Sequence, residues 1–373
     1  MQGMKILIVV ISAGGGHIAL GEALREAYAT YSKDTEVRVL DPFPKWIARA
    51  YRYMTTGRGV FIWKSMWAVS KYKTIEQIGR NINYKLLLRK RLFREISIFQ
   101  PNVVISNNPM TINELSTLRE EHNLHYKIGI QVADPFTPHK IWFEDGDIDV
   151  LLAPTPQVAR QAIESGIPQD KVKTVGWLTR KEFLGRATTS SSLKKKLGLT
   201  VGGKIIFFAT SGLTSAYVKE IVESIVTTCD RQAYKLLINT GDEKLQHIFT
   251  HASNFQKCCI VVPQVSDIYR YMALADIVMG KAGPNTLFEA LHLQKPFFAV
   301  AHVPGQEDGN VRFIETEGVG WVEESLVKIA PKLKSILGND RERKVYAARA
   351  KAVSKMHKDT ARRIVAAISS IAD

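Results

Sequence analysis

Short apolar runs that alternate with helical segments are the feature that most constrains the fold of this chain. The first run is KILIVVI at 5–11, which leads into the glycine turn SAGGGH and then into a helical pattern. Similar runs follow at 37–41, 102–106, 126–134 and 149–154. Runs that are short, continuous and rich in β-branched residues are typical of parallel strands buried on both faces. The alternation therefore predicts an α/β domain with a parallel sheet.

A second series of the same kind begins near Lys204. Its apolar runs lie at 204–209, 234–241, 258–265, 275–280 and 295–301. The stretch from about 179 to 203 holds TTSSS, KKK and glycine-containing turns, which is typical of a linker. We therefore expect one α/β domain at 1–180, a second at 200–350 and a C-terminal helix at 351–373. A chain of 373 residues has the length of two ordinary domains.

The charge of the chain favours a polyanionic partner. Lys and Arg number 51 against 36 Asp and Glu, a formal net charge of +15. The three cysteines form no CxxC pair, so the sequence indicates neither a disulfide framework nor a zinc site, and it favours the cytosol. The uncharged run Ile6–Gly21 is interrupted by glycines and predicts neither a transmembrane helix nor a signal peptide. If the chain works at a membrane, we expect it to lie on the surface.

The segment Lys45–Arg94 carries most of that charge. It holds 13 Lys and Arg and one acid, Glu76, and so contributes +12 of the net +15. It also holds nine aromatic residues, among them Trp46, Trp63 and Trp67. Trp and Tyr favour the membrane–water boundary, and clustered cations favour anionic headgroups. The combination predicts a surface that binds anionic lipid, although a solvated basic insertion with its own aromatic core would share this composition. No nucleic-acid-binding signature accompanies it, so we expect no nucleic-acid partner.

Two strand–glycine–helix turns have the chemistry of ligand sites. In the first, Gly14–Gly16 precede His17, which would lie at a helix start and could act as a general base near neutral pH. In the second, a strand ends in Gly280–Pro284, and a helix opens at Asn285 or Thr286 as its N-cap. A helix N-terminus at the carboxyl end of a parallel strand is suited to bind phosphate.

Polar residues around the second turn suit a nucleotide-linked sugar. Glu289 lies one turn into the helix, where a carboxylate can accept hydrogen bonds from both ribose hydroxyls. Gln306, Glu307 and Asn310 cluster after the next strand, as a polyhydroxyl ligand would require.

These motifs resemble a known family. KAGPNTLFEA followed by PGQEDGN is similar to the donor-site signature of family 28 glycosyltransferases of GT-B fold, and most like that of the monogalactosyldiacylglycerol synthases and processive diacylglycerol glucosyltransferases. SAGGGH and VADPFTPHKIW, which contains Asp134, resemble the amino domain of the same group. The resemblance runs from about Lys5 to Trp321. It implies two Rossmann-like domains with parallel sheets facing a cleft, an N-terminal one for the acceptor and membrane and a C-terminal one for the UDP-sugar.

The resemblance also implies roles for individual residues. His17 would act near the acceptor hydroxyl as the base, with Asp134 as the alternative. The resemblance implies Ser211 and Gly212 beside the diphosphate, Val265 at the uracil, Gly283, Pro284, Asn285 and Thr286 at the pyrophosphate, Glu289 at the ribose, and Gln306 and Glu307 at the hexose. We also expect Gly16, Lys281 and Asn310 among the donor-binding residues.

The implied reaction moves galactose or glucose from a UDP-hexose to diacylglycerol with inversion, giving a β-glycolipid. Helix N–H groups would stabilise the departing diphosphate, so no metal or other cofactor is expected. The sequence Glu144–Asp149 contains a D-x-D pattern, which we interpret as an acidic turn.

The enzyme would bind the cytoplasmic face of a membrane as a peripheral protein. A polyprenyl-diphosphate-linked sugar as acceptor, a UDP-sugar epimerase and a non-catalytic UDP-sugar or nucleic-acid-binding protein remain alternatives. The oligomeric state stays open.

Overall fold

The computed structural model describes residues 3–12, 15–55, 59–69, 84–143, 146–185, 191–199 and 203–372. The chain forms two compact units. The first comprises Met1–Lys181, Pro304–Gly309 and Met356–Asp373, and the second comprises Glu182–Val303 and Asn310–Lys355. The first unit therefore includes the chain's last helix and one short loop that interrupts the second unit in sequence.

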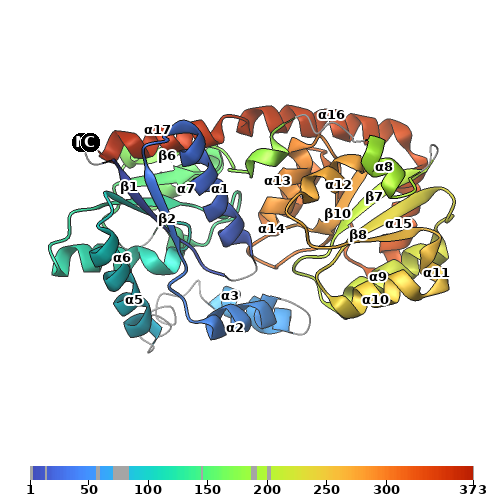
Figure 1. Ribbon diagram of the computed structural model, residues 1–373, viewed down its shortest axis with the longest axis horizontal. Helices are drawn as coiled ribbons and strands as arrows, with labels where there is room; N and C mark the ends of the chain where they lie inside the picture. The colour runs from blue at the N-terminus through green and yellow to red at the C-terminus, as the bar shows by residue number, and fades with distance from the viewer. Residues whose placement is uncertain are drawn as a thin grey trace. The chain divides into compact units, whose positions relative to one another are not determined.

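The first unit is built on a six-stranded parallel sheet (Figure 1). Its strands are β1 (Lys5–Val9), β2 (Glu36–Leu40), β3 (Val103–Ser106), β4 (Lys127–Gln131), β5 (Val150–Ala153) and β6 (Val172–Thr174). Their order in the sheet is β2-β1-β3-β4-β5-β6. Strands β1, β3 and β5 are almost wholly buried, which is why the sequence shows them as continuous apolar runs.

Helices cover both faces of this sheet. The helices of this unit are α1 (Gly16–Tyr31), α2 (Lys45–Thr55), α3 (Val60–Val69), α5 (Tyr84–Phe99), α6 (Ile112–Glu121), α7 (Pro156–Glu164) and α17 (Thr360–Ala372), with short 3-10 helices at Pro109–Thr111, Lys140–Trp142 and Gln169–Lys171. Apolar residues of α5, α6 and α7 form one core with the sheet, while α1 and α17 pack together on the other face. No helix that the structure describes combines the length and the apolar character needed to span a bilayer.

The second unit repeats the architecture. Its strands are β7 (Lys204–Ala209), β8 (Tyr234–Asn239), β9 (Cys259–Val262), β10 (Ile277–Lys281), β11 (Phe297–Ala301) and β12 (Gly320–Val322), in the order β12-β11-β10-β7-β8-β9. All neighbouring pairs are parallel. The predicted α/β class with two parallel sheets is confirmed. The sequence does not predict β6 and β12, because each has only three residues at a sheet edge.

Helices also surround the second sheet. They are α8 (Ser191–Lys196), α9 (Ser215–Thr228), α10 (Glu243–His251), α11 (Ser253–Gln256), α12 (Ile268–Leu274), α13 (Pro284–His292) and α15 (Leu326–Gly338), with a 3-10 helix at Lys181–Phe183. Helices α14 (Asp308–Thr316) and α16 (Asp340–His357) each have residues in both units. Helices α9 and α15 pack together over one face, and α13 contacts β10 and β11. Because the strands of this sheet are parallel, the carboxyl ends of β7, β10 and β11 lie at the same edge of the sheet.

Candidate active site

His17 lies at the start of α1, at the carboxyl edge of the first sheet. Gly15 is the N-cap of this helix and has a φ of +79°, a conformation that glycine adopts without strain. Gly16 is the first helical residue, whereas Gly14 lies outside the described residues. The glycine turn therefore places His17 in the first turn of the helix, as the sequence predicts.

A reciprocal pair of hydrogen bonds fixes His17 against the residue after β3. Its Nδ1 lies 2.7 Å from the carbonyl oxygen of Asn107, and the Asn107 amide donates to the His17 carbonyl at 2.8 Å. Because a carbonyl only accepts, Nδ1 carries the proton and Nε2 of the neutral ring carries the lone pair. Burial lowers the pKa of His17 and outweighs the two contacts with Asn107. The ring is therefore neutral at physiological pH, as a general base requires.

Asp134 is a buried carboxylate just beyond β4. Its Oδ2 accepts a hydrogen bond from Trp142 Nε1 at 2.8 Å, and its Oδ1 accepts one from Gln306 Nε2 at 3.1 Å. Burial raises the pKa of Asp134 to about 6, the two hydrogen bonds oppose that rise, and the nearby Glu307 carboxylate adds to it. A carboxyl group with such a pKa can exchange a proton near neutral pH.

The loop 304–309 brings two predicted sugar-binding residues into the first unit. Tyr51 donates to Gln306 Oε1 at 3.0 Å, and Thr137 donates to the Gln306 carbonyl at 3.0 Å. The Tyr51 bond orients the Gln306 amide so that its nitrogen faces Asp134. Glu307 is buried in the same place. Gln306 and Asp134, which the sequence analysis assigns to different substrates, are therefore hydrogen-bonded neighbours.

Two of the three tryptophans expected to enter the membrane belong to a packed aromatic row. Trp63 lies edge-on to Tyr51 with ring centroids 5.4 Å apart, Trp67 lies 5.6 Å from Trp63, and His139 lies 4.9 Å from Trp67. Trp63 Nε1 also donates to the carbonyl of Pro304 at 3.3 Å. This packing leaves Trp63 and Trp67 half-buried, and their insertion into a membrane stays a prediction.

Trp46 keeps the exposure that membrane insertion requires. It is exposed on α2, and Tyr53, Phe61 and Ile62 of the same segment are exposed as well. Residues 56–58 and 70–83 of the basic segment, with Tyr72 and Glu76, lie outside the described residues.

The second unit assembles the predicted diphosphate loop at the end of β10. The N-cap of α13 is Gly283, which makes no side-chain capping bond, and Pro284 is the first helical residue. The N-cap therefore lies two residues before Asn285 and three before Thr286, the expected N-caps, because proline is favoured at the first helical position. Asn285 and Thr286 lie in the first turn instead, where backbone N–H groups have no partner within the helix.

Lys281 and Ser211–Gly212 meet beside this loop. Gly212 has a φ of +78°, and a Cβ atom there would lie 2.8 Å from Lys281 Cε, so the lysine passes directly over the glycine. Ser211 is exposed, and Val265 is half-buried three residues after β9. The predicted residues after β10, β7 and β9 thus lie at the same edge of the parallel sheet.

Two further predicted residues are buried beside that edge. Asn310 donates to the carbonyl of Ala282 at 2.7 Å, so its amide nitrogen supports the diphosphate loop. Its Oδ1 has no hydrogen-bond partner among the residues that the structure describes. Glu289 is also buried, on α13. A plain connecting helix would leave this carboxylate in solvent, whereas in this structure the carboxylate is buried.

The acidic turn before β5 has an ion-pair role. Arg119 donates to Asp147 at 2.8 Å and to Asp149 at 2.7 Å, while Lys127 and Lys171 each lie 3.3 Å from one of these carboxylates. A backbone N–H and Arg119 lower the pKa of Asp149 against the opposing effect of burial. Glu144 and Asp145 lie outside the described residues.

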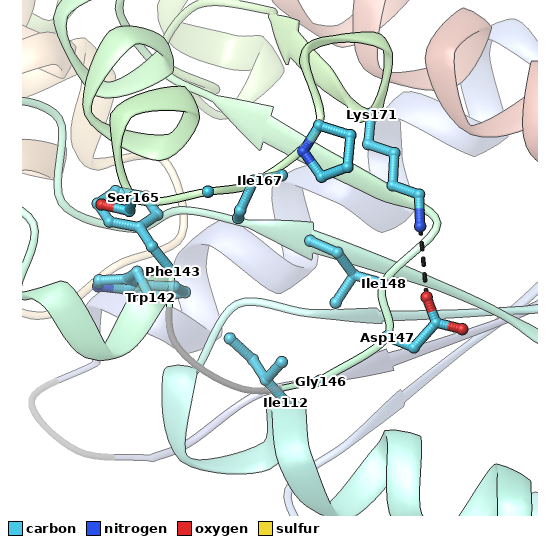
Figure 2. A pocket seen from close by; sticks show the side chains of 11 residues that line it. Ile112, Trp142, Phe143, Gly146, Asp147, Ile148, Ser165, Ile167 and Lys171 are labelled. Carbon is cyan, nitrogen blue, oxygen red and sulfur yellow. Dashed lines mark hydrogen bonds and ion pairs between the residues drawn. The ribbon is translucent and has the colours of Figure 1, made fainter.

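A cavity of about 330 Å³ lies beside this turn (Figure 2). Figure 2 shows the side chains of Trp142, Ile148 and Ile167 around it, with Lys171 paired to Asp147. Trp142 therefore lines this cavity with its ring while its Nε1 holds Asp134.

Sequence reasoning missed Asn107 and Tyr51. Asn107 carries a usable signal, because it directly follows a buried strand at the carboxyl edge of a parallel sheet. Tyr51 carries none, because only a contact across 255 residues of chain reveals its role.

Two family models match successive parts of the chain. Residues 17–177 match the model described as monogalactosyldiacylglycerol (MGDG) synthase, and residues 207–364 match the glycosyltransferase family 28 C-terminal domain. The first match includes His17, Asn107 and Asp134, and the second includes the diphosphate loop.

Curated relatives extend over most of the chain. Chloroplastic monogalactosyldiacylglycerol synthase 3 of Arabidopsis thaliana is 23% identical over 357 residues, which cover 90% of this chain and 75% of the relative. The chloroplastic synthase of Spinacia oleracea is 23% identical over 352 residues, which cover 90% of this chain and 66% of the relative.

Solved structures share the fold. Anabaena HepE in complex with UDP superimposes with a TM-score of 0.61 at 13% identity and covers 98% of this chain and 100% of its own. The spinosyn rhamnosyltransferase SpnG superimposes with a TM-score of 0.65 at 14% identity, with the same coverage. The expected GT-B fold is confirmed.

Proposed function

Since the chain belongs to glycosyltransferase family 28 and is a UDP-sugar-dependent hexosyltransferase, we propose that its acceptor is diacylglycerol at a membrane surface. The match of residues 17–177 to the monogalactosyldiacylglycerol synthase model carries this proposal. That part of the chain contains His17, Asp134 and most of the basic aromatic segment. The relatives' names make galactose the first sugar to test and glucose the second.

The proposed reaction begins at His17. The lone pair on Nε2 removes the proton of the diacylglycerol hydroxyl as that oxygen attacks the anomeric carbon. Asn107 supports this role because its carbonyl holds the Nδ1 proton and so selects the tautomer. Asp134 is the alternative base. Its two hydrogen-bond donors keep the carboxyl group oriented for a sugar or acceptor hydroxyl.

The departing group is UDP. As the bond between the anomeric carbon and the phosphate oxygen breaks, its electron pair passes to the diphosphate. The first-turn N–H groups of α13 and the Lys281 ammonium would stabilise the added negative charge. Attack from the face opposite UDP inverts an α-linked donor to a β-glycoside.

A product assay tests the proposal. Labelled UDP-galactose and UDP-glucose are supplied separately with vesicles that contain diacylglycerol, and the lipids are extracted and analysed. We expect one donor to give a monohexosyl diacylglycerol with β configuration. UDP-sugar binding without a glycolipid product from either donor would contradict diacylglycerol as the acceptor.

A further inference from the structure

A histidine–glutamate pair lies at the carboxyl edge of the second sheet, outside the predicted donor residues. His302 directly follows β11, and Glu324 lies two residues beyond β12. Nδ1 of His302 is 2.6 Å from Oε1 of Glu324. The contact joins the ends of two adjacent parallel strands.

Tyr217 on α9 braces both strand ends. Its hydroxyl lies 2.8 Å from the carbonyl oxygen of Val300 and 3.2 Å from that of Glu324. The backbones that carry the pair are therefore tied to the same helix. Hydrogen bonds of this kind hold the backbone of a functional side chain in a fixed position.

The pair adjoins the diphosphate loop. The backbone N–H of Ala282 donates to the carbonyl of Ala301 at 2.8 Å, so the residue before His302 is bonded to the residue before Gly283. In the strand register, Lys281 faces Ala301. His302 therefore lies beside the backbone of the loop that starts α13.

We propose that His302 binds the diphosphate of the UDP-sugar as an imidazolium ion that Glu324 positions. This inference rests on the proposed function. A neutral histidine whose Nδ1–H is bonded to a carboxylate has only an acceptor at Nε2, whereas the protonated ring has a donor there that suits a phosphate oxygen. A neighbouring carboxylate favours the protonated ring. Donor binding then takes up a proton.

The other charged and titratable groups around the pair have defined places. Lys281 ends β10, Glu323 follows β12, and Tyr217 comes from α9. Of these residue types, histidine alone has an ordinary pKa that places its charge change between pH 5 and 8. If donor binding depends on pH in this range and the dependence requires His302, it therefore reports the protonation of the His302–Glu324 pair.

Calorimetry with UDP-galactose and UDP-glucose, without acceptor, tests the inference. The diphosphate of a UDP-sugar has no terminal phosphate to titrate between pH 6 and 8. We expect the wild-type protein to bind the donor about tenfold more tightly at pH 6 than at pH 8, as one unit of pKa change on binding produces. His302→Gln should remove this dependence and bind at both pH values as the wild type does at pH 8.

Two further variants complete the design. His251→Gln changes an exposed histidine at the far end of α10 and should keep the wild-type pH dependence. Glu324→Gln retains an acceptor oxygen but removes the charge, so it should move the pH midpoint of binding downward. This variant also decides the inference if His302→Gln unfolds.

The outcomes separate this inference from the proposed function. A wild-type protein that binds the donor equally at pH 6 and 8, or a Glu324→Gln variant with an unchanged midpoint, overturns the role of His302 alone. If the wild type binds neither UDP-sugar at either pH, the proposed donor class fails, and this inference fails with it.

Discussion

At the scale of single residues, burial acts in opposite directions on the two groups that can move a proton. It lowers the pKa of His17 and raises that of Asp134 to about 6. Near neutral pH the imidazole is therefore neutral, and the carboxyl group is close to its titration range. Pairs of groups whose surroundings separate their roles in this way are typical of acid–base sites. Asn107 and Trp142 hold the two groups in place through one hydrogen bond each.

His17→Ala should reduce turnover by roughly 100-fold or more, because general base catalysis is typically worth that factor. UDP affinity should change little, because the predicted donor-loop contacts with UDP lie in the second unit and Gly16 keeps its backbone in this variant. Steady-state kinetics and UDP calorimetry measure the two effects. His125→Ala is the matched control, since this exposed histidine precedes β4 at the opposite edge of the sheet. Wild-type turnover in His17→Ala would transfer the role of base to Asp134.

Trp142→Phe should move the acid limb of the kcat/KM profile upward by about one pH unit. The Trp142 N–H stabilises the ionised Asp134, and a hydrogen bond to a charged group is worth about 1.5–3 kcal/mol. Without it, burial raises the pKa of Asp134 further, so activity that needs the carboxylate is lost at a higher pH as the pH falls.

The phenylalanine still fills the wall of the cavity in Figure 2. Trp321→Phe is the control, because the Nε1 of this buried residue has no hydrogen-bond partner in the described part of the chain. Equal acid limbs in wild type and Trp142→Phe would show that ionised Asp134 is not required.

At the scale of elements, the two helices that start the candidate sites begin at glycines. The N-caps of α1 and α13 are Gly15 and Gly283, and neither makes a side-chain capping bond. Helices α7 and α10 are instead capped by Thr155 and Asp242. A glycine N-cap leaves first-turn N–H groups for a ligand and allows that ligand to approach the backbone.

Glu289→Gln on α13 should weaken UDP binding at least tenfold. The predicted role is to accept two charge-assisted hydrogen bonds from the ribose, each worth about 1.5–3 kcal/mol. The amide keeps the size of the buried side chain, so the helix should stay folded. Calorimetry with UDP measures the loss, and Glu315→Gln on the exposed side of α14 serves as control. Unchanged UDP affinity in a folded Glu289→Gln protein would remove this residue from the ribose role.

The sequence predicts those features of these elements that depend on residues close together in the chain. Buried strands such as β1 are continuous apolar runs, and glycine turns reveal the starts of α1 and α13 to within three residues. The bond between Gln306 and Asp134 joins residues 172 positions apart, and no local pattern encodes it. The packing of Trp63 and Trp67 could not be predicted for the same reason. Composition indicates an aromatic segment but not which of its rings pack together or against the loop at Pro304.

At the scale of the whole molecule, charge and exposed apolar side chains share one segment. Residues 45–94 supply +12 of the net charge of +15. On α2 and α3 the same segment exposes Trp46, Tyr53 and Phe61. Exposed charge attracts an anionic surface over about a Debye length, whereas aromatic insertion acts only on contact and is not screened by salt. The two contributions can therefore be separated by experiment.

Co-sedimentation with vesicles that contain phosphatidylglycerol, compared with neutral vesicles, should show strong binding only to the anionic ones. Binding should weaken steeply as salt rises from 0.1 M to 1 M, where the Debye length falls from about 10 Å to about 3 Å. Trp46→Ser with Phe61→Ser should keep this salt dependence but lower the binding that remains at high salt. Val327→Ser removes an equally exposed side chain from the second unit and should change nothing.

Trp63→Ser with Trp67→Ser should act differently, because these rings pack inside the first unit. This double variant should lower the thermal unfolding temperature, whereas Trp46→Ser with Phe61→Ser should not. UDP affinity should be unaffected by the exposed pair, since neither Trp46 nor Phe61 is a predicted UDP contact. Equal binding to both kinds of vesicle, or to neither, would mean that the basic segment is a solvated surface. A diacylglycerol acceptor would then require another route to the lipid, because the charge of this segment would no longer bring the enzyme to it.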